Sequence, residues 1–104
     1  MLIRVDNKVV GKIENRVFYK TVDPEKHLFR IMDAWGIDFG AFKLALAKGV
    51  KKFIVIDKEN NICYEADADT LLEKGIVGNF RYGEQVFLPR RLWEIKDQNQ
   101  MQLL

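Results

Sequence analysis

His27 and Arg30 are the two residues whose types and spacing come closest to a catalytic pair. On a helix, residues three positions apart project from one surface. An imidazole acts as general acid or base near neutral pH, and a guanidinium holds a phosphate group. With Tyr19 or Lys20 assisting, they would suit a small metal-independent phosphodiesterase resembling a ribonuclease in its chemistry. The alternative is a solvated helix surface with no chemical role.

A second candidate is the segment 78–93, which concentrates basic and aromatic residues. Aromatic rings stack on unpaired bases while arginines hold the phosphate backbone, so this composition indicates contact with single-stranded nucleic acid. A lysine cluster at positions 48–52 adds positive charge. The alternative is that the rings belong to the core and the arginines pair with acids. The candidate interface comprises Arg81, Tyr82, Gln85, Arg90, Arg91, Trp93, Lys48, Lys51 and Lys52.

Four acidic residues, Asp57, Glu65, Asp67 and Asp69, are a possible set of Mg²⁺ ligands, because this ion prefers carboxylate oxygens. The pairing register of the surrounding hairpin decides the question. If Asp57 pairs with Ile62, Glu65 faces the other side of the sheet, whereas a slip of one residue would bring the carboxylates together. We expect the first register, no metal site, and helix capping by Asp67 or Asp69.

Other chemistries are excluded by composition. The chain has no serine, which removes serine hydrolases, and no glycine-rich loop followed by lysine and serine or threonine, which removes a phosphate loop. The single cysteine, Cys63, excludes an internal disulfide and a cysteine-based metal site, and it suits a reducing cytoplasm. We expect no cofactor.

The 104 residues carry a net charge of +2, with 48% hydrophobic and 31% charged residues, which is a globular composition. The N-terminal residues lack the apolar stretch of a signal peptide. The longest apolar run, 53–56, is far too short to cross a membrane. We therefore expect a cytoplasmic protein that does not contact a membrane.

The first half of the chain predicts three antiparallel strands over 2–5, 9–13 and 16–22, with Asn7 and Asn15 at turn positions of positive φ and Gly11 at a bulge. A helix over 24–35 is then expected, with Asp23 as its N-cap and Gly36 at its end. Its buried face would consist of Leu28, Ile31, Met32 and Trp35. An extended segment is the competing interpretation.

A second helix is expected between Asp38 as cap and Gly49, with Phe39, Phe42 and Leu46 on one face. The second half predicts a hairpin of 53–56 with 62–66, a short helix over 70–74 closed by Gly75, and a loop followed by a strand over 85–88. A helical turn after Pro89 and a frayed tail complete the chain.

These elements predict an α+β fold, because strands and helices are segregated along the chain. We expect one small domain over 1–97, with a mostly antiparallel sheet of about six short strands packed against two or three short helices, and a frayed tail over 98–104. The predicted function is a small non-catalytic binding module that contacts nucleic acid. The two alternatives are the phosphodiesterase and a protein-partner or self-assembly module, with a homodimer formed through a sheet edge or the tail.

Overall fold

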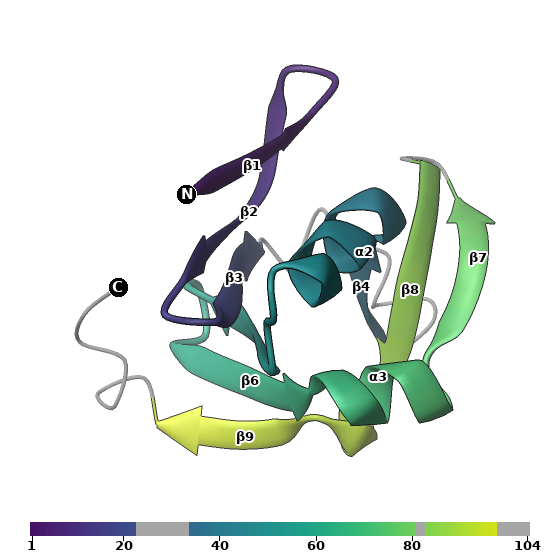
Figure 1. Ribbon diagram of the computed structural model, residues 1–104. Helices are drawn as coiled ribbons and strands as arrows, with labels where there is room; N and C mark the ends of the chain where they lie inside the picture. The colour runs from purple at the N-terminus through teal and green to yellow at the C-terminus, as the bar shows by residue number, and fades with distance from the viewer. Residues whose placement is uncertain (23–33, 81–82, 98–104) are drawn as a thin grey trace.

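The computed structural model describes residues 1–22, 34–80 and 83–97 of the chain (Figure 1). The described residues form one small domain that is mostly strands and broadly α+β. Its elements are β1 (Leu2–Val5), β2 (Lys8–Glu14), β3 (Val17–Val22), β4 (Ala34–Asp38), α2 (Phe39–Ala47), β5 (Lys52–Asp57), β6 (Ile62–Asp67), α3 (Ala68–Lys74), β7 (Ile76–Phe80), β8 (Gly83–Pro89), the 3₁₀ turn η1 (Arg90–Leu92) and β9 (Glu94–Asp97).

The N-terminal strands pair as the sequence predicts. β1, β2 and β3 form an antiparallel meander, and both turns contain asparagines of positive φ, 66° at Asn7 and 52° at Asn15. The β1–β2 register shifts by one residue, because Ile3 pairs with Gly11 while Arg4 pairs with Val9. The predicted bulge therefore lies beside Gly11.

The meander belongs to a larger sheet, sheet A, whose order is β1-β2-β3-β5-β6-β9. The β3–β5 pair is parallel, whereas the other pairs in this sheet are antiparallel. A parallel pair needs a long crossover connection, which the chain between Val22 and Lys52 supplies. The β5–β6 hairpin has the expected register, with Asp57 opposite Ile62 and Glu65 opposite Ile54.

A second sheet, sheet B, contains three antiparallel strands in the order β4-β8-β7. It corrects two predictions. Trp35 and Gly36 lie in strand β4 and not at the end of a helix, because β4 pairs along its whole length with β8. Residues 78–80 belong to β7 and not to a loop. The remainder of the predicted helix, 24–33, lies outside the described residues.

The described C-terminal segment also departs from the expectation of a helical turn followed by a frayed tail. The turn is present as η1, but Glu94–Asp97 forms β9, which pairs antiparallel with β6. The segment is too short and too charged to be recognised as a strand from its own composition, and its partner lies about thirty residues earlier in the chain.

Helix α2 follows the prediction closely. The carboxylate Oδ1 of Asp38 accepts a hydrogen bond from the Ala41 backbone N–H at 2.9 Å, and Gly49 adopts a φ of 80° after the helix ends. Figure 1 places α2 between the meander and β8. The main core lies between α2 and the inner faces of the two sheets, and its largest fully buried side chains include Trp35, Phe18 and Phe53.

Helix α3 is shorter and follows β6 directly. Asp67 occupies its N-cap position, as expected, but its side chain makes no capping hydrogen bond. Gly75 ends the helix in an extended conformation, with its backbone N–H donating to Leu71 O at 2.9 Å. Within the described residues, no helix is long and apolar enough to cross a membrane.

Candidate functional site

Tyr19 and Lys20 do not converge on one site. They are successive residues of β3, so their side chains project to opposite faces of sheet A. Tyr19 packs against a small apolar cluster on the outer face, made of Ile54, Ile56 and Cys63. Lys20 reaches the opposite side, toward β4. At most one of them can therefore assist His27 and Arg30, which lie outside the described residues.

Lys20 links the two sheets. Its Nζ donates a hydrogen bond to the backbone carbonyl oxygen of Gly36 on β4. Burial lowers the pKa of this amine from its ordinary 10.5 to about 8, while the nearby Asp38 carboxylate acts in the opposite direction. Lowered lysine pKa values occur at catalytic sites. Here the amine is directed at a backbone carbonyl on the edge of sheet B, which is a structural role.

Tyr19 lies in a different environment. The Lys12 amine is 5.7 Å from the centroid of its ring, within the range of a cation–π contact. Burial raises the pKa of the Tyr19 hydroxyl, and the Glu14 carboxylate adds to this effect. A raised pKa keeps the phenol protonated near neutral pH, so Tyr19 is a poor general base.

The basic-aromatic segment is divided between core and surface. Trp93 is only 4% exposed, and its indole N–H donates to Leu88 O at 3.0 Å. This burial leaves its ring unavailable for stacking on a base, so Trp93 is removed from the predicted interface. Gln85 is partly buried on β8, with its side chain over Gly36. Arg81 and Tyr82 lie outside the described residues.

The predicted basic residues within the described part of the chain are all at the surface. Arg90 and Arg91 are exposed on η1, and Lys48, Lys51 and Lys52 are exposed near the end of α2 and the start of β5. The Lys52 amine lies 4.0 Å from Glu65, so part of its charge is offset. The lysine cluster is therefore bordered by acid and does not form a purely positive surface.

The acidic residues also have partners. Asp57 is buried and accepts two hydrogen bonds from Asn60, at 3.0 Å from the backbone N–H and at 2.8 Å from the side-chain amide. It thereby fixes the hairpin turn. Glu65 lies on the outer face, on the other side of the sheet. Among the described residues, no group of three or more metal-ligating side chains converges.

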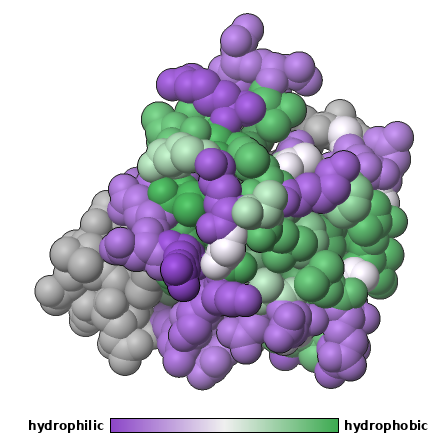
Figure 2. Space-filling view, in the orientation of Figure 1, coloured by the Kyte–Doolittle hydropathy of each residue, from purple (hydrophilic) through white to green (hydrophobic). Residues whose placement is uncertain are grey.

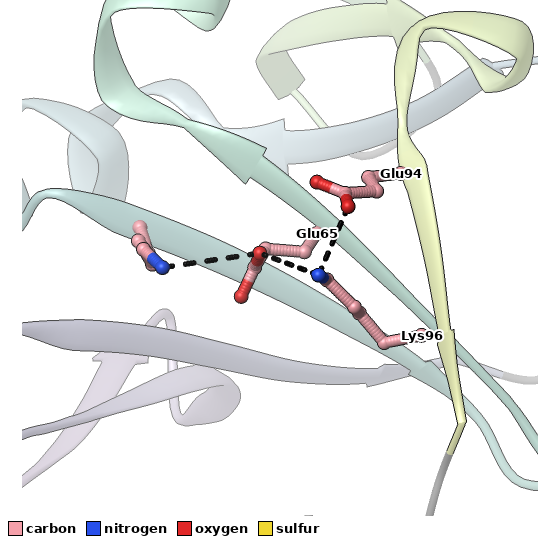
Figure 3. Close-up of polar contacts among 4 residues, drawn as sticks. Glu65, Glu94 and Lys96 are labelled. Carbon is pink, nitrogen blue, oxygen red and sulfur yellow. Dashed lines mark ion pairs between the residues drawn. The ribbon is translucent and has the colours of Figure 1, made fainter. Parts of the chain in front are cut away.

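Glu65 belongs to a chain of ion pairs that extends to β9 (Figure 3). Its carboxylate lies 4.0 Å from the Lys96 amine, which is itself 2.9 Å from Glu94. The hydrogen bond that the Lys96 amine donates to the Glu94 carboxylate is the main cause of the raised pKa of Lys96. Exposed pairs of this kind contribute little stability. They connect side chains of β9 and β6, which are paired through their backbones, and they assemble no catalytic group.

The exposed edge of sheet B was not predicted from the sequence. Strand β7 pairs with β8 on one side, and no described strand pairs with its other side. Ile76 is 63% exposed and Val77 is 49% exposed, and Leu72 on the adjoining helix α3 is 59% exposed. Figure 2 shows hydrophobic surface on the right, the side on which Figure 1 places β7 and β8. We call β7 and these three side chains the β7 edge.

The edges of sheet A differ from β7 in carrying charge, although Leu2 on β1 and Ile95 on β9 are also exposed, at 55% and 66%. β1 carries Arg4, and β9 carries Glu94 and Lys96. Charged side chains on edge strands oppose pairing with another chain. β4 is buried along most of its length, and its Gly36 carbonyl already accepts a hydrogen bond from Lys20. The β7 strand contains no charged residue and no proline.

The sequence holds a weak signal for this strand. Ile76 and Val77 are β-branched, but Gly78 and Asn79 follow at once and are typical of loops. Strand formation here depends on pairing with β8. This pairing continues without interruption from Ile76, which lies opposite Phe87, to Phe80, which lies opposite Gly83.

Comparison of the chain with protein-family models, curated proteins and solved structures finds no match.

Proposed function

We propose that this protein is a non-catalytic cytoplasmic binding module that captures an extended segment of a protein partner at the β7 edge. The observation that carries the proposal is an uncharged edge strand with both Ile76 and Val77 exposed. An added strand gains main-chain hydrogen bonds from such an edge, while alternate side chains provide specificity. Cys63 is buried and forms no disulfide, in keeping with a reducing compartment.

The competing functions have less support. A nucleic-acid interface cannot use Trp93 to stack on a base, because this side chain is packed in the core. The phosphodiesterase would need Tyr19 or Lys20 beside His27, but the Lys20 amine donates to the Gly36 carbonyl oxygen and Tyr19 packs against the apolar cluster on the outer face of sheet A. The self-assembly module, by contrast, needs an accessible edge, and the β7 edge provides one.

The proposal is tested with a blocked, uncharged peptide of alternating threonine and valine, titrated into labelled protein while backbone amide signals are followed by NMR. We expect shifts centred on β7, because the peptide extends sheet B. Insertion of a proline into the peptide removes a ladder hydrogen bond and should weaken binding at least about tenfold, which corresponds to about 1.4 kcal/mol.

A pair of protein variants provides the matched control. Val77→Lys places a charge on the β7 edge, whereas Leu44→Lys makes the same type of change at an exposed position on α2. Binding should weaken in the first variant and persist in the second. Equal binding by both, or shifts located away from β7, would overturn the proposal.

Contact with single-stranded nucleic acid remains a second candidate, favoured by one observation. η1 presents the exposed side chains of Arg90 and Arg91, and it is anchored by the buried Trp93. Changing both arginines to glutamine should weaken binding of single-stranded RNA and DNA and flatten its salt dependence, because fewer counterions are released. Fluorescence anisotropy at two salt concentrations measures both effects, and identical binding by the double variant would exclude this interface.

A further inference from the structure

Gly78 lies in the middle of β7, where the described residues give no local reason for a glycine. Its φ is not positive, unlike the φ of Gly49 and of Gly83. The β7–β8 register passes through it without a bulge. An added Cβ would lie 3.6 Å from the Phe87 ring, which is ordinary van der Waals contact.

At three other glycines, neighbouring atoms leave no room for a side chain. An added Cβ would lie 2.2 Å from the Phe18 ring at Gly11, 2.5 Å from Gln85 Oε1 at Gly36, and 2.3 Å from Leu71 O at Gly75. A glycine inside a strand costs about 0.5–1 kcal/mol relative to alanine. Besides bulges and bends, such a glycine marks a place where another backbone approaches closely.

We propose that the strand added to the β7 edge is β7 of a second copy of this chain, paired antiparallel about a twofold axis that passes between the two Gly78 residues. This inference rests on the proposed function and names its partner. The register sets Val77 opposite Asn79 and Gly78 opposite its own copy. The two copies of sheet B then form one continuous six-stranded sheet.

The chemistry of the strand suits self-pairing. Antiparallel pairing about a twofold axis sets the central residue of a strand against itself, so a charge there would face a like charge. The central residues of β7 are Val77, Gly78 and Asn79, none of which is charged. Glycine at the axis also allows the closest approach of the two backbones.

The adjoining apolar residues enlarge the surface available to a second copy. Leu72 and Ile76 are both more than half exposed beside the strand. A contact built on one five-residue strand falls at the small end of specific interfaces, which typically bury about 1,200–2,000 Å² in total. The dimer should therefore be weak and dependent on concentration.

The test uses the full chain and two charged variants, Gly78→Lys and Gly78→Asp, in sedimentation velocity over a wide range of concentration. The parent protein should show a dimer that increases with concentration. Each variant alone should dimerise at least about tenfold more weakly, because two like charges meet at the axis. A mixture of the two variants should recover the dimer, because opposite charges then face each other.

A control at the next position checks the register. In Asn79→Lys and Asn79→Asp the new side chain faces Val77 of the other copy, so mixing should recover much less of the dimer. Circular dichroism of each variant establishes that it is folded. If a charge at position 78 unfolds the chain, the exposed Asn79→Lys variant tests the same edge, and loss of the dimer is again expected.

The outcomes separate this inference from the function on which it rests. A parent protein that stays monomeric at every concentration while its β7 binds the threonine–valine peptide overturns the self-pairing and leaves the strand-addition function in place. A dimer that persists in both charged variants also overturns it, because the contact must then lie elsewhere. Failure of the peptide to bind β7 removes the proposed function itself.

Discussion

The two edges of sheet B are built from similar residues and have opposite surroundings. β4 and β7 are both five residues long, contain a central glycine and flank β8. On β4, Trp35 and Ile37 are buried, and the Gly36 carbonyl oxygen accepts a hydrogen bond from the Lys20 amine. On β7, Ile76 and Val77 remain exposed. One edge of the sheet is therefore covered by the fold, whereas no described strand lies beside the other.

The largest expected effect comes from removing the most deeply packed aromatic side chain of β4. Trp35 is 1% exposed, and its ring centroid lies 5.3 Å from that of Tyr64. Trp35→Ala should lower the free energy of unfolding by about 3–5 kcal/mol, as measured by denaturant titration. Ile76→Ala on β7 should change it by less than about 0.5 kcal/mol. Similar losses in the two variants would show that β4 and β7 do not differ in how deeply their side chains are packed.

The two central glycines provide the next test. Both lie beside the Phe87 ring, but an added Cβ would be 2.7 Å from it at Gly36 and 3.6 Å at Gly78. Gly36→Ala should destabilise the protein by about 1–3 kcal/mol because the site is overpacked. Gly78→Ala should stabilise the monomer by up to about 1 kcal/mol, because alanine is better suited to a strand. Thermal unfolding at low protein concentration checks both, and a loss at Gly78 would show a local requirement for glycine.

Lys20 allows a test of the closed edge by pH. Its pKa is about 8 in the folded protein and 10.5 ordinarily, so between these values the unfolded chain binds more protons. This group therefore raises the free energy of unfolding as pH rises through that window. The Lys20→Met variant has no amine that titrates in this window. Its free energy of unfolding, relative to that of the parent, should therefore fall by about 1–3 kcal/mol between pH 8 and 10.5. A constant difference across that range would contradict the burial of the amine.

Local patterns in the sequence predict the parts of this fold that depend on near neighbours. The asparagine turns, the capping of α2 by Asp38 and the register of the 52–67 hairpin all follow from residues within a few positions of one another. These features are reliable because turn chemistry and side-chain alternation act locally.

The elements that were mispredicted depend on distant partners. The spacing of Leu28, Ile31, Met32 and Trp35 fits a helix, but Trp35 is drawn into β4 by pairing with β8, some fifty residues later. The parallel β3–β5 pair and the β6–β9 pair arise in the same way. The candidate site was missed for a related reason, because Gly78 and Asn79 have loop preferences that pairing with β8 overrides.

The most direct test of the open edge is amide hydrogen exchange, followed residue by residue at low and at high protein concentration. We predict that amides of β7 gain protection as concentration rises, since an added strand covers them, while amides of β4 keep the same protection throughout. Unchanged exchange along β7 at every concentration, and also in the presence of the threonine–valine peptide, would contradict the account, because the edge would then bind no strand at all.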